Sequence, residues 1–440
     1  MRHTPKLVTL ALLLMAAVGP GAAAEEPTPP VDEATALHMN AAHSGAVDGS
    51  GQTPPLVQRW DRDLGDLLSY PVVTGGRVFV VVRGIDGGYG TTLHGLDAQT
   101  GEDLWEPIAI SGSWYWSGIT AGDGRIYVLS GDGRLTAFDQ ATGALVWTVK
   151  HANMFASSEP TFYDGVVYAG GSGVGGVLYA ADASDGHLLW SASLMNSDHS
   201  SPAVTEDAVF TGSTCEDIRA FDRLTGMKLW QHPSSCTGGG GRTVAVADGK
   251  VWARQPFGSN LVLDVATGAE VGTFASGPLP AFHDGRGFFL EGSTLRARST
   301  STLVAQWSFP SLDSLVSAPI VVNGNVYIGT QSGKLHVLDE ATGELMWTTD
   351  VGSPIRPPDE HNVSEPVTGL GAGEGLIVVP ATDRLVAYES LHSRLEPLTP
   401  ARILDTRPTG PQRGYTGAKP AAGATLLVDV LGQGGVPETH

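Results

Sequence analysis

LTAFDQATGALVW (135–147) is one copy of a segment that returns at 93–105, 178–190, 218–230 and 335–347 of this 440-residue chain. Each copy joins two apolar, alternating stretches through a turn that opens on Asp and closes on Gly. Successive copies lie about forty residues apart, a period typical of a radial array with four short strands in each unit. The sequence therefore predicts an all-β propeller.

The recurring aspartate suits a turn better than a metal site. Aspartate can accept backbone N–H groups two or three residues further on, and glycine adopts positive φ without strain. A turn role explains the Asp, Thr and Gly together, whereas metal ligation explains only the Asp. The series comprises Asp97, Asp139, Asp182, Asp222, Asp264 and Asp339.

A tryptophan follows the glycine by four residues in the regular copies. It offers a large area for packing against a neighbouring unit, and stacking on a ligand is the alternative role. Its regular recurrence in outer strands favours packing between blades. The fifth unit has Gly272 in this position, and the sixth shifts Trp307 by one place.

The number of units follows from the ends of the repeat region. Seven units carry inner and outer strands, whereas the eighth (364–390) supplies three strands and no tryptophan. The segment LVQRWDRDL (56–64) precedes the first inner strand and carries Trp60 as an outer strand would. An open sheet edge leaves backbone groups unpaired. We therefore expect an eight-bladed β-propeller of four-stranded antiparallel blades, with the N-terminal strand closing the last blade.

These repeats resemble the PQQ-like (quinoprotein alcohol dehydrogenase-like) β-propeller family over residues 56–391. That family includes quinoprotein alcohol dehydrogenases and the non-catalytic outer-membrane barrel assembly lipoprotein. The segments HMNAAHSG (38–45) and 369–388 are also similar to secreted actinobacterial members. The resemblance implies either a quinone-dependent oxidoreductase with calcium or a binding scaffold.

The chain departs from the enzymes of this family where catalysis takes place. They carry adjacent cysteines over the quinone, long insertions, and Glu, Asn and Asp ligands for calcium. This chain has no adjacent cysteines and only short insertions, and no cofactor residue can be transferred to it. We therefore expect no cofactor and no catalysis, with a PQQ-dependent dehydrogenase as the alternative. Trp116, Arg242 and Arg356 would supply part of a quinone site only if their loops converge.

The N-terminal segment predicts that the protein is exported from the cytoplasm. Residues 1–26 have a basic start, an apolar run and small residues at 22–24, the pattern of a cleavable signal peptide. No cysteine lies near the cleavage point, so we expect a secreted protein without a lipid anchor. We also expect no membrane span and a monomer. The net charge of −20 argues against nucleic-acid and anionic-membrane partners. The expected parts are a signal peptide (1–24), an N-terminal extension (25–55), the propeller (56–395) and a partial C-terminal module with a Leu-Asp-Thr-Arg motif (396–440).

The two cysteines belong to the fourth unit. Cys215 ends one strand and Cys236 follows another strand that runs in the same direction, so both are expected on one face of the blade. In an exported protein this placement favours a disulfide over free thiols or a metal pair.

Ligands of propellers usually bind at loops that lead into the inner strands. Here those loops are polar and uneven, and Glu159 and Glu365 occupy equivalent positions before a strand proline. A concave rim of mixed aromatic and charged residues is a candidate site for a protein, peptide or glycan. Ordinary solvated loop residues are the alternative. The candidate rim comprises Trp114, Trp116, Glu159, His199, Arg242, Arg356, His361 and Glu365. His38 and His43 form a weaker candidate for metal binding because no third ligand is near in sequence.

Overall fold

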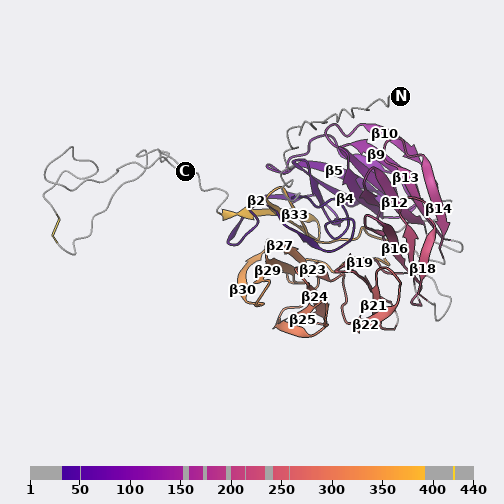
Figure 1. The fold of residues 1–440 in the computed structure, drawn as a ribbon. Coiled ribbons are helices and arrows are strands. Elements are labelled where there is room, and N and C mark those ends of the chain that lie inside the picture. Colours follow the sequence, from indigo (N-terminus) through magenta and orange to yellow (C-terminus); the bar gives the residue numbers. More distant parts are fainter. Residues whose placement is uncertain are drawn as a thin grey trace, which may run out of the picture. The chain divides into compact units, whose positions relative to one another are not determined.

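The computed structural model describes residues 32–49, 51–151, 158–171, 176–194, 200–213, 215–232, 241–256, 258–391 and 420–421. Within these residues the strands form eight sheets, each built on four antiparallel strands, and one of them has a fifth, parallel strand. The all-β propeller predicted from the repeats is confirmed (Figure 1). No helix in the described part of the chain is long and apolar enough to cross a bilayer.

Each blade runs from an inner strand A to an outer strand D. Blades I to IV are β3 (Val72–Thr74), β4 (Arg77–Ile85), β5 (Gly88–Asp97), β6 (Ile108–Ile110); β7 (Ser117–Gly122), β8 (Arg125–Ser130), β9 (Leu135–Asp139), β10 (Leu145–Val149); β11 (Thr161–Tyr163), β12 (Val166–Gly171), β13 (Val177–Asp182), β14 (Leu188–Ser193); and β15 (Ala203–Val204), β16 (Ala208–Gly212), β17 (Ile218–Asp222), β18 (Lys228–Gln231). Blades V to VII are β19 (Val244–Ala247), β20 (Lys250–Ala253), β21 (Asn260–Asp264), β22 (Glu270–Phe274); β23 (Ala281–His283), β24 (Arg286–Glu291), β25 (Thr294–Ser299), β26 (Ala305–Pro310); and β27 (Ile320–Val322), β28 (Asn325–Gly329), β29 (Lys334–Asp339), β30 (Leu345–Asp350).

Blade VIII is completed by the N-terminal strand, as predicted. It consists of β31 (Gly371–Gly373), β32 (Leu376–Ala381), β33 (Arg384–Ser390) and β2 (Leu56–Asp63), and β2 pairs antiparallel with β33. Figure 1 shows these two strands, from distant parts of the sequence, side by side. Trp60 of β2 is buried and donates its indole N–H to the Ala98 carbonyl of blade I at 2.8 Å. The ring therefore closes through backbone pairing and through a side chain.

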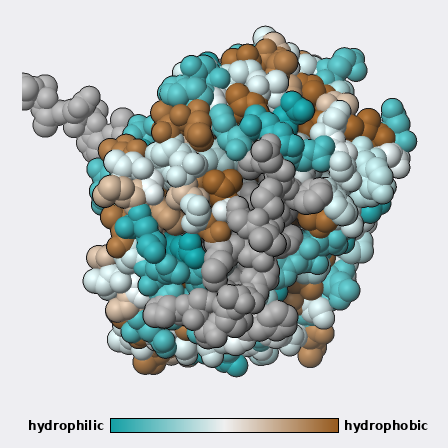
Figure 2. All heavy atoms as spheres, turned by 90° about the vertical axis from the view of Figure 1, so that its right-hand side faces the viewer, coloured by the Kyte–Doolittle hydropathy of each residue, from teal (hydrophilic) through white to brown (hydrophobic). Residues whose placement is uncertain are grey.

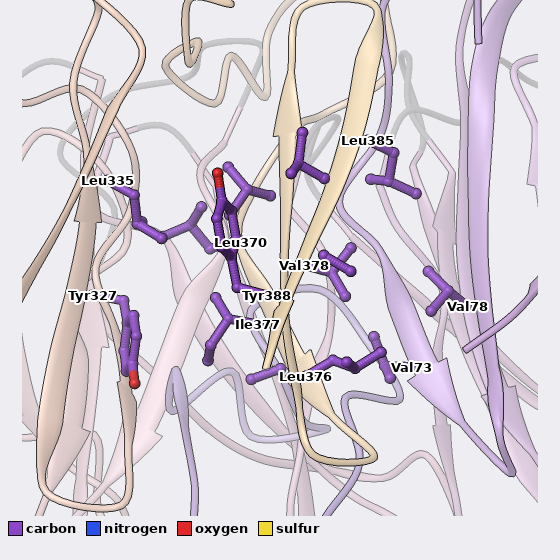
Figure 3. Close-up of a cluster of buried hydrophobic side chains, with 14 of the residues drawn as sticks. Val73, Val78, Tyr327, Leu335, Leu370, Leu376, Ile377, Val378, Leu385 and Tyr388 are labelled. Atoms are coloured by element: carbon purple, nitrogen blue, oxygen red, sulfur yellow. The ribbon is translucent and has the colours of Figure 1, made fainter. Parts of the chain in front are cut away.

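Apolar side chains fill the seams on both sides of the closing blade. Figure 3 shows Tyr327 and Leu335 of blade VII, Ile377 and Tyr388 of blade VIII, and Val78 of blade I in one cluster. These strands are buried on both faces because a propeller blade is covered by a neighbour on each side. Their sequences consequently read as continuous apolar runs rather than strict alternation.

The turn role predicted for the repeated aspartates is confirmed. In blade II, one oxygen of Asp139 accepts the Thr142 N–H at 2.9 Å and the Thr142 hydroxyl at 2.7 Å. These bonds hold the pKa of Asp139 below its usual value. Asp97, Asp222, Asp264 and Asp339 make the same pair of bonds to a threonine, and Asp182 binds Ser184 instead.

The tryptophans pack between blades, which was also predicted. Trp147 lies over Gly186, the turn glycine of the next blade, where an added Cβ would meet the indole at 2.8 Å. Its indole N–H also binds the Ala183 carbonyl at 3.1 Å. Five other tryptophans make the same two contacts, one with a turn glycine and one with the backbone carbonyl three residues before it. The pairs are Trp60 with Gly101, Trp105 with Gly143, Trp190 with Gly226, Trp230 with Gly268 and Trp307 with Gly343. The displacement of Trp307 by one place in the sequence does not remove its contact.

One interface reverses this arrangement. Gly272 of blade V stands where the tryptophan is missing, and Leu303 of blade VI stands where the turn glycine is missing. An added Cβ on Gly272 would lie 2.7 Å from Leu303 Cδ1, and Leu303 holds φ at +59°. The large residue has moved to the other side of the interface, so the gap is filled.

A segment placed outside the propeller by the sequence analysis also belongs to the fold. Residues 32–48 run along the inner strands, and β1 (Ala46–Val47) pairs parallel with β27 as a fifth strand of blade VII. We call residues 32–48 the N-terminal strap.

Candidate functional site

The antiparallel order of the blades gives the ring two faces. The D–A and B–C connections emerge on one face, which we call the loop face. The A–B and C–D turns emerge on the other, which we call the turn face. The candidate rim residues that the structure describes belong to the loop face, and the turn aspartates belong to the turn face.

The strap crosses the channel at the turn-face ends of the inner strands. Its backbone forms hydrogen bonds of 2.7 to 2.9 Å with seven blades. The partners are Val73, Ala121, Val204, Val246, Phe282, Val321 and Glu374. The eighth contact is made by a side chain, since His43 Nε2 lies 3.4 Å from Thr161 Oγ1 of blade III. The chain therefore fills this end of its own channel.

The connection between blades VII and VIII (351–370) enters the channel from the loop face. It carries Glu360, whose side chain is buried beside blade V. One carboxylate oxygen accepts the Thr243 N–H at 2.7 Å, and the other pairs with the buried guanidinium of Arg254. Burial alone would raise the pKa of Glu360, but Arg254 and the Thr243 N–H outweigh it and hold the pKa below the usual value.

Glu360 completes a chain of hydrogen bonds between neighbouring inner strands. The N–H of Glu159 donates to Ser201 Oγ at 2.9 Å, and the N–H of Ser201 donates to Thr243 Oγ1 at 3.1 Å. The pairing of strands A and B places Leu279 at the equivalent position of blade VI. Leucine has no acceptor for the Thr243 N–H, and the Glu360 carboxylate takes its place. A buried N–H without a partner would be costly, which explains why this loop reaches so far inward.

Glu159 is the second buried carboxyl group of the channel. The Ser201 hydroxyl donates to its Oε2 at 2.6 Å, and its Oε1 has no hydrogen-bond partner among the described residues. Burial raises the pKa of Glu159 to about 7, although the Ser201 hydrogen bond opposes the rise. The group therefore titrates near neutral pH.

The two strap histidines are structural. His38 Nε2 lies 3.1 Å from the Pro280 carbonyl, and His43 Nδ1 lies 3.1 Å from the Val244 carbonyl. Burial lowers the pKa of His38 to about 3 and that of His43 to about 4, so both rings are neutral donors. Each ring serves a different blade, and the pair does not converge on a common point for a metal ion.

The channel does not fit a quinone cofactor. The cavity between the strap and the Glu360 loop has a volume of about 20 Å³ and is lined mainly by apolar residues such as Leu37, Leu279 and Leu370. A cavity of roughly 10–15 Å³ already holds one water molecule, so this space suits a water and not a tricyclic quinone. Trp116 is buried, and Arg356 pairs with Glu365 at 2.6 Å, so neither offers a free surface to a cofactor.

The two remaining rim candidates that the structure describes contact different blades. His361 binds the Gly241 carbonyl at 2.7 Å through Nε2, which holds the Glu360 loop against blade V. Trp114 is half-buried beside Gly131 of blade II. His199 lies outside the described residues, as does Cys236, so the disulfide stays a prediction. The sequence analysis did not single out Arg254, because this residue directly follows strand B of blade V (β20) and does not belong to a loop that leads into an inner strand.

Arg242 lines a pocket on the loop face. The pocket has a volume of about 340 Å³, and its walls come from four connections between blades, from β24 and from the B–C turn of blade VI. The lining residues are Arg242, Gly277, Pro278, Leu290, Gly292, Leu315, Val316, Pro357 and Pro358. We call this space the Arg242 pocket.

Two other features are weaker candidates. On blades I and II, exposed Tyr89 packs on Tyr115 at 4.9 Å between ring centres, and Arg83 lies over Tyr115 at 5.8 Å. On blade III, Asp182, Asp185 and His187 lie close together, but they are largely exposed and already bonded within their turn. Apolar residues of the outer strands are exposed too, yet Figure 2 shows hydrophobic side chains scattered among hydrophilic ones.

Eight four-stranded blades, repeated Asp-to-Gly turns and inter-blade tryptophans define a repeat β-propeller whose channel is filled by its own chain. The chain belongs to the family described as outer membrane protein assembly factor BamB, whose sequence model matches residues 57–215 and 214–394. The predicted resemblance to the PQQ-like repeat family is thereby confirmed.

Curated relatives are of two kinds. Outer membrane protein assembly factor BamB of Moranella endobia is 26% identical over 328 residues, which cover 66% of this chain and 80% of the relative. The dehydrogenase subunit of alcohol dehydrogenase (quinone) from Gluconobacter oxydans is 25% identical over 351 residues, which cover 66% of this chain and 40% of the relative.

Solved structures of both kinds superimpose on this chain. BamB from Moraxella catarrhalis superimposes with a TM-score of 0.59 at 16% identity, covering 76% of this chain and 99% of that one. Quinohemoprotein alcohol dehydrogenase from Comamonas testosteroni superimposes with a TM-score of 0.62 at 15% identity, covering 86% and 83%. At these identities the likeness concerns the fold alone.

Proposed function

We propose that this protein is a secreted, non-catalytic β-propeller that binds a protein partner through its loop face. The observation that carries the proposal is the filled channel. The strap closes one end, Glu360 enters from the other, and the space between them suits a water molecule. If the channel holds no ligand site, the protein must act through the outer surfaces of the propeller.

The relatives support a binding role. Those that cover most of their own length in the alignment are named as assembly factors for outer membrane proteins. Assembly factors work by contact with other proteins, and we extend that general role, without a specific partner, to this chain. The loop face is favoured because its connections differ in length and composition, whereas the turn face consists of repeated tight turns.

The second candidate is a quinone-dependent dehydrogenase, which the similarity to alcohol dehydrogenase (quinone) favours. Two features oppose it. The alignment covers less than half of that relative, and the Glu360 loop and the strap occupy the channel that a quinone would need. We therefore rank it second and assign no catalytic residues.

Site-specific photo-crosslinking in the native host tests the binding role. A photoreactive residue is placed at exposed Ser314 on the loop face. It is compared with one at exposed Ala341, which lies in the C–D turn of blade VII on the turn face. We expect a protein adduct of defined mass from Ser314 and none from Ala341. Adducts of equal yield from both positions, or none from Ser314 and other loop-face positions, would contradict the proposal.

A further inference from the structure

The Arg242 pocket joins one positive charge to apolar walls. Its residues come from the connections that precede blades V, VI, VII and VIII and from the B–C turn of blade VI. Prolines and aliphatic side chains form most of the surface, including Pro278, Leu315 and Pro357. A volume of about 340 Å³ lies at the lower end of the range for small-ligand sites, roughly 300–1,000 Å³.

The guanidinium group of Arg242 has no partner in the part of the chain that the structure describes. Among the described residues, no acceptor forms a hydrogen bond or ion pair with it, and its Nε is buried and unbonded. The nearby carboxylate of Glu360 is not available, because Arg254 and the Thr243 N–H already bind its two oxygens. Leaving a half-buried guanidinium unpaired costs free energy. The chain has a net charge of −20 and many carboxylates, yet none of the described ones pairs with Arg242. An anion from outside the chain would supply the missing partner.

We propose that the Arg242 pocket binds the C-terminal residue of a partner polypeptide, with its carboxylate on Arg242 and its aliphatic side chain against the proline and leucine walls. This inference rests on the proposed binding role and names the feature of the partner that is recognised. A guanidinium presents paired donors that match a carboxylate in bidentate geometry. A C-terminal aliphatic residue carries a single negative charge and an apolar group on the same carbon, which matches one arginine in a small apolar pocket.

An internal acidic residue fits less well. Its carboxylate sits at the end of its own side chain, so the apolar walls would have to be covered by neighbouring residues. A dianion such as a phosphate would find no second free cation among the described arginines nearby, because Arg254 and Arg356 pair with Glu360 and Glu365.

The test is fluorescence anisotropy with the full chain and three dye-labelled peptides. The first is Gly-Ser-Gly-Ala-Leu with a free carboxylate. The second has the same sequence with a C-terminal amide, and the third is an amide with Glu in place of Ala. We expect saturable binding of the first, at least tenfold weaker binding of the second and third, and weaker binding as salt is added.

Variants locate the binding. Arg242→Gln should weaken binding of the free-carboxylate peptide at least tenfold, and Val316→Glu should do the same because it adds a carboxylate to the pocket that Arg242 also lines. Arg134→Gln is the matched control. Arg134 is an exposed arginine that lines a separate pocket of about 410 Å³ on blades I and II, and it has no described ion-pair partner. That variant should bind as the wild type does.

Several outcomes would overturn the inference. They are equal binding of the acid and amide peptides, preference for the internal Glu peptide, no binding of any peptide, or unchanged binding by both pocket variants. If the peptides fail while Ser314 still gives face-specific crosslinks, this inference is wrong and the binding role stands. If peptides bind but crosslinks show no preference for the loop face, the proposed function is wrong.

Discussion

At the scale of residues, the seam between blades V and VI shows how the ring tolerates a broken repeat. Every regular seam pairs a tryptophan with a turn glycine, because the indole lies where a Cβ would otherwise be. At this seam Gly272 faces Leu303, and the leucine accepts a left-handed backbone to reach the space. The two departures compensate each other, although each alone looks like a loss of the motif.

Substitution at both positions should restore the regular seam. Gly272→Trp alone should lower the free energy of unfolding by about 1–3 kcal/mol, since Leu303 occupies the space that the indole needs. Adding Leu303→Gly should recover most of that loss and give a coupling energy of roughly 1–3 kcal/mol. In the double variant the Thr300 carbonyl is the expected acceptor for the indole N–H. Urea unfolding of the four proteins measures the cycle, and additive effects would mean that the two residues do not compensate.

Glu159 should make stability depend on pH. Its pKa is about 7 in the folded protein against 4.5 for an ordinary glutamate. Between these values the folded state holds a proton that the unfolded chain has released, so the folded state loses stability as pH rises. We expect the wild type to lose about 3 kcal/mol relative to Glu159→Gln between pH 4.5 and 7.5. Parallel pH profiles of the two proteins in urea unfolding would show that Glu159 is not the titrating group.

Residues that recur were predictable, and residues that act once were not. Asp139 and Trp147 have five or more counterparts in the sequence, so their roles could be inferred from the pattern. Arg254 has no counterpart, and its pairing with Glu360 joins residues that are more than one hundred positions apart. Nothing in the local sequence indicates such a contact.

At the scale of elements, closure of the ring depends on β2. It pairs with β33 along its length, and Trp60 connects it to blade I. Trp60→Ala should lower the free energy of unfolding by about 3–5 kcal/mol, since it removes a buried indole and its hydrogen bond. Leu145→Ala, in the exposed outer strand β10, is the control and should change stability by less than about 0.5 kcal/mol. Equal effects would show that β2 is dispensable for closure.

The connection after β16 carries the predicted disulfide. Cys215 is buried, and a bond to Cys236 would close a loop of about twenty residues and stabilise the fold by roughly 3 kcal/mol in the chain-entropy model. Alkylation of the denatured protein followed by intact mass measurement tests it. We expect no label before reduction and two labels after it. Two labels without reduction would show free thiols.

The blades and β2 were predictable because each element repeats or completes a pattern. The strap was not, because its contacts are backbone hydrogen bonds that any sequence can make. Its two histidines suggested a metal site when considered alone. The structure gives them backbone carbonyl partners in different blades instead.

At the scale of the whole molecule, the filled channel is the basis of the proposed surface recognition. The strap lies at one end of the channel and Glu360 enters from the other, and Arg242, which has no partner among the described residues, lines a pocket on the loop face. The family resemblance was evident from the repeats, but it includes enzymes and assembly factors with the same blades. The ranking of the two functions for this chain therefore rests on its filled channel and on the extent of each alignment.

The measurement that tests this account most directly is quinone binding. The full chain is incubated with pyrroloquinoline quinone and Ca²⁺, dialysed, and examined for retained visible absorption, beside the apoenzyme of a quinoprotein dehydrogenase as positive control. The account predicts that the control retains one quinone per chain and that this protein retains only background. A stoichiometric quinone, with dye-linked alcohol oxidation that depends on it, would contradict the account and make the protein an enzyme.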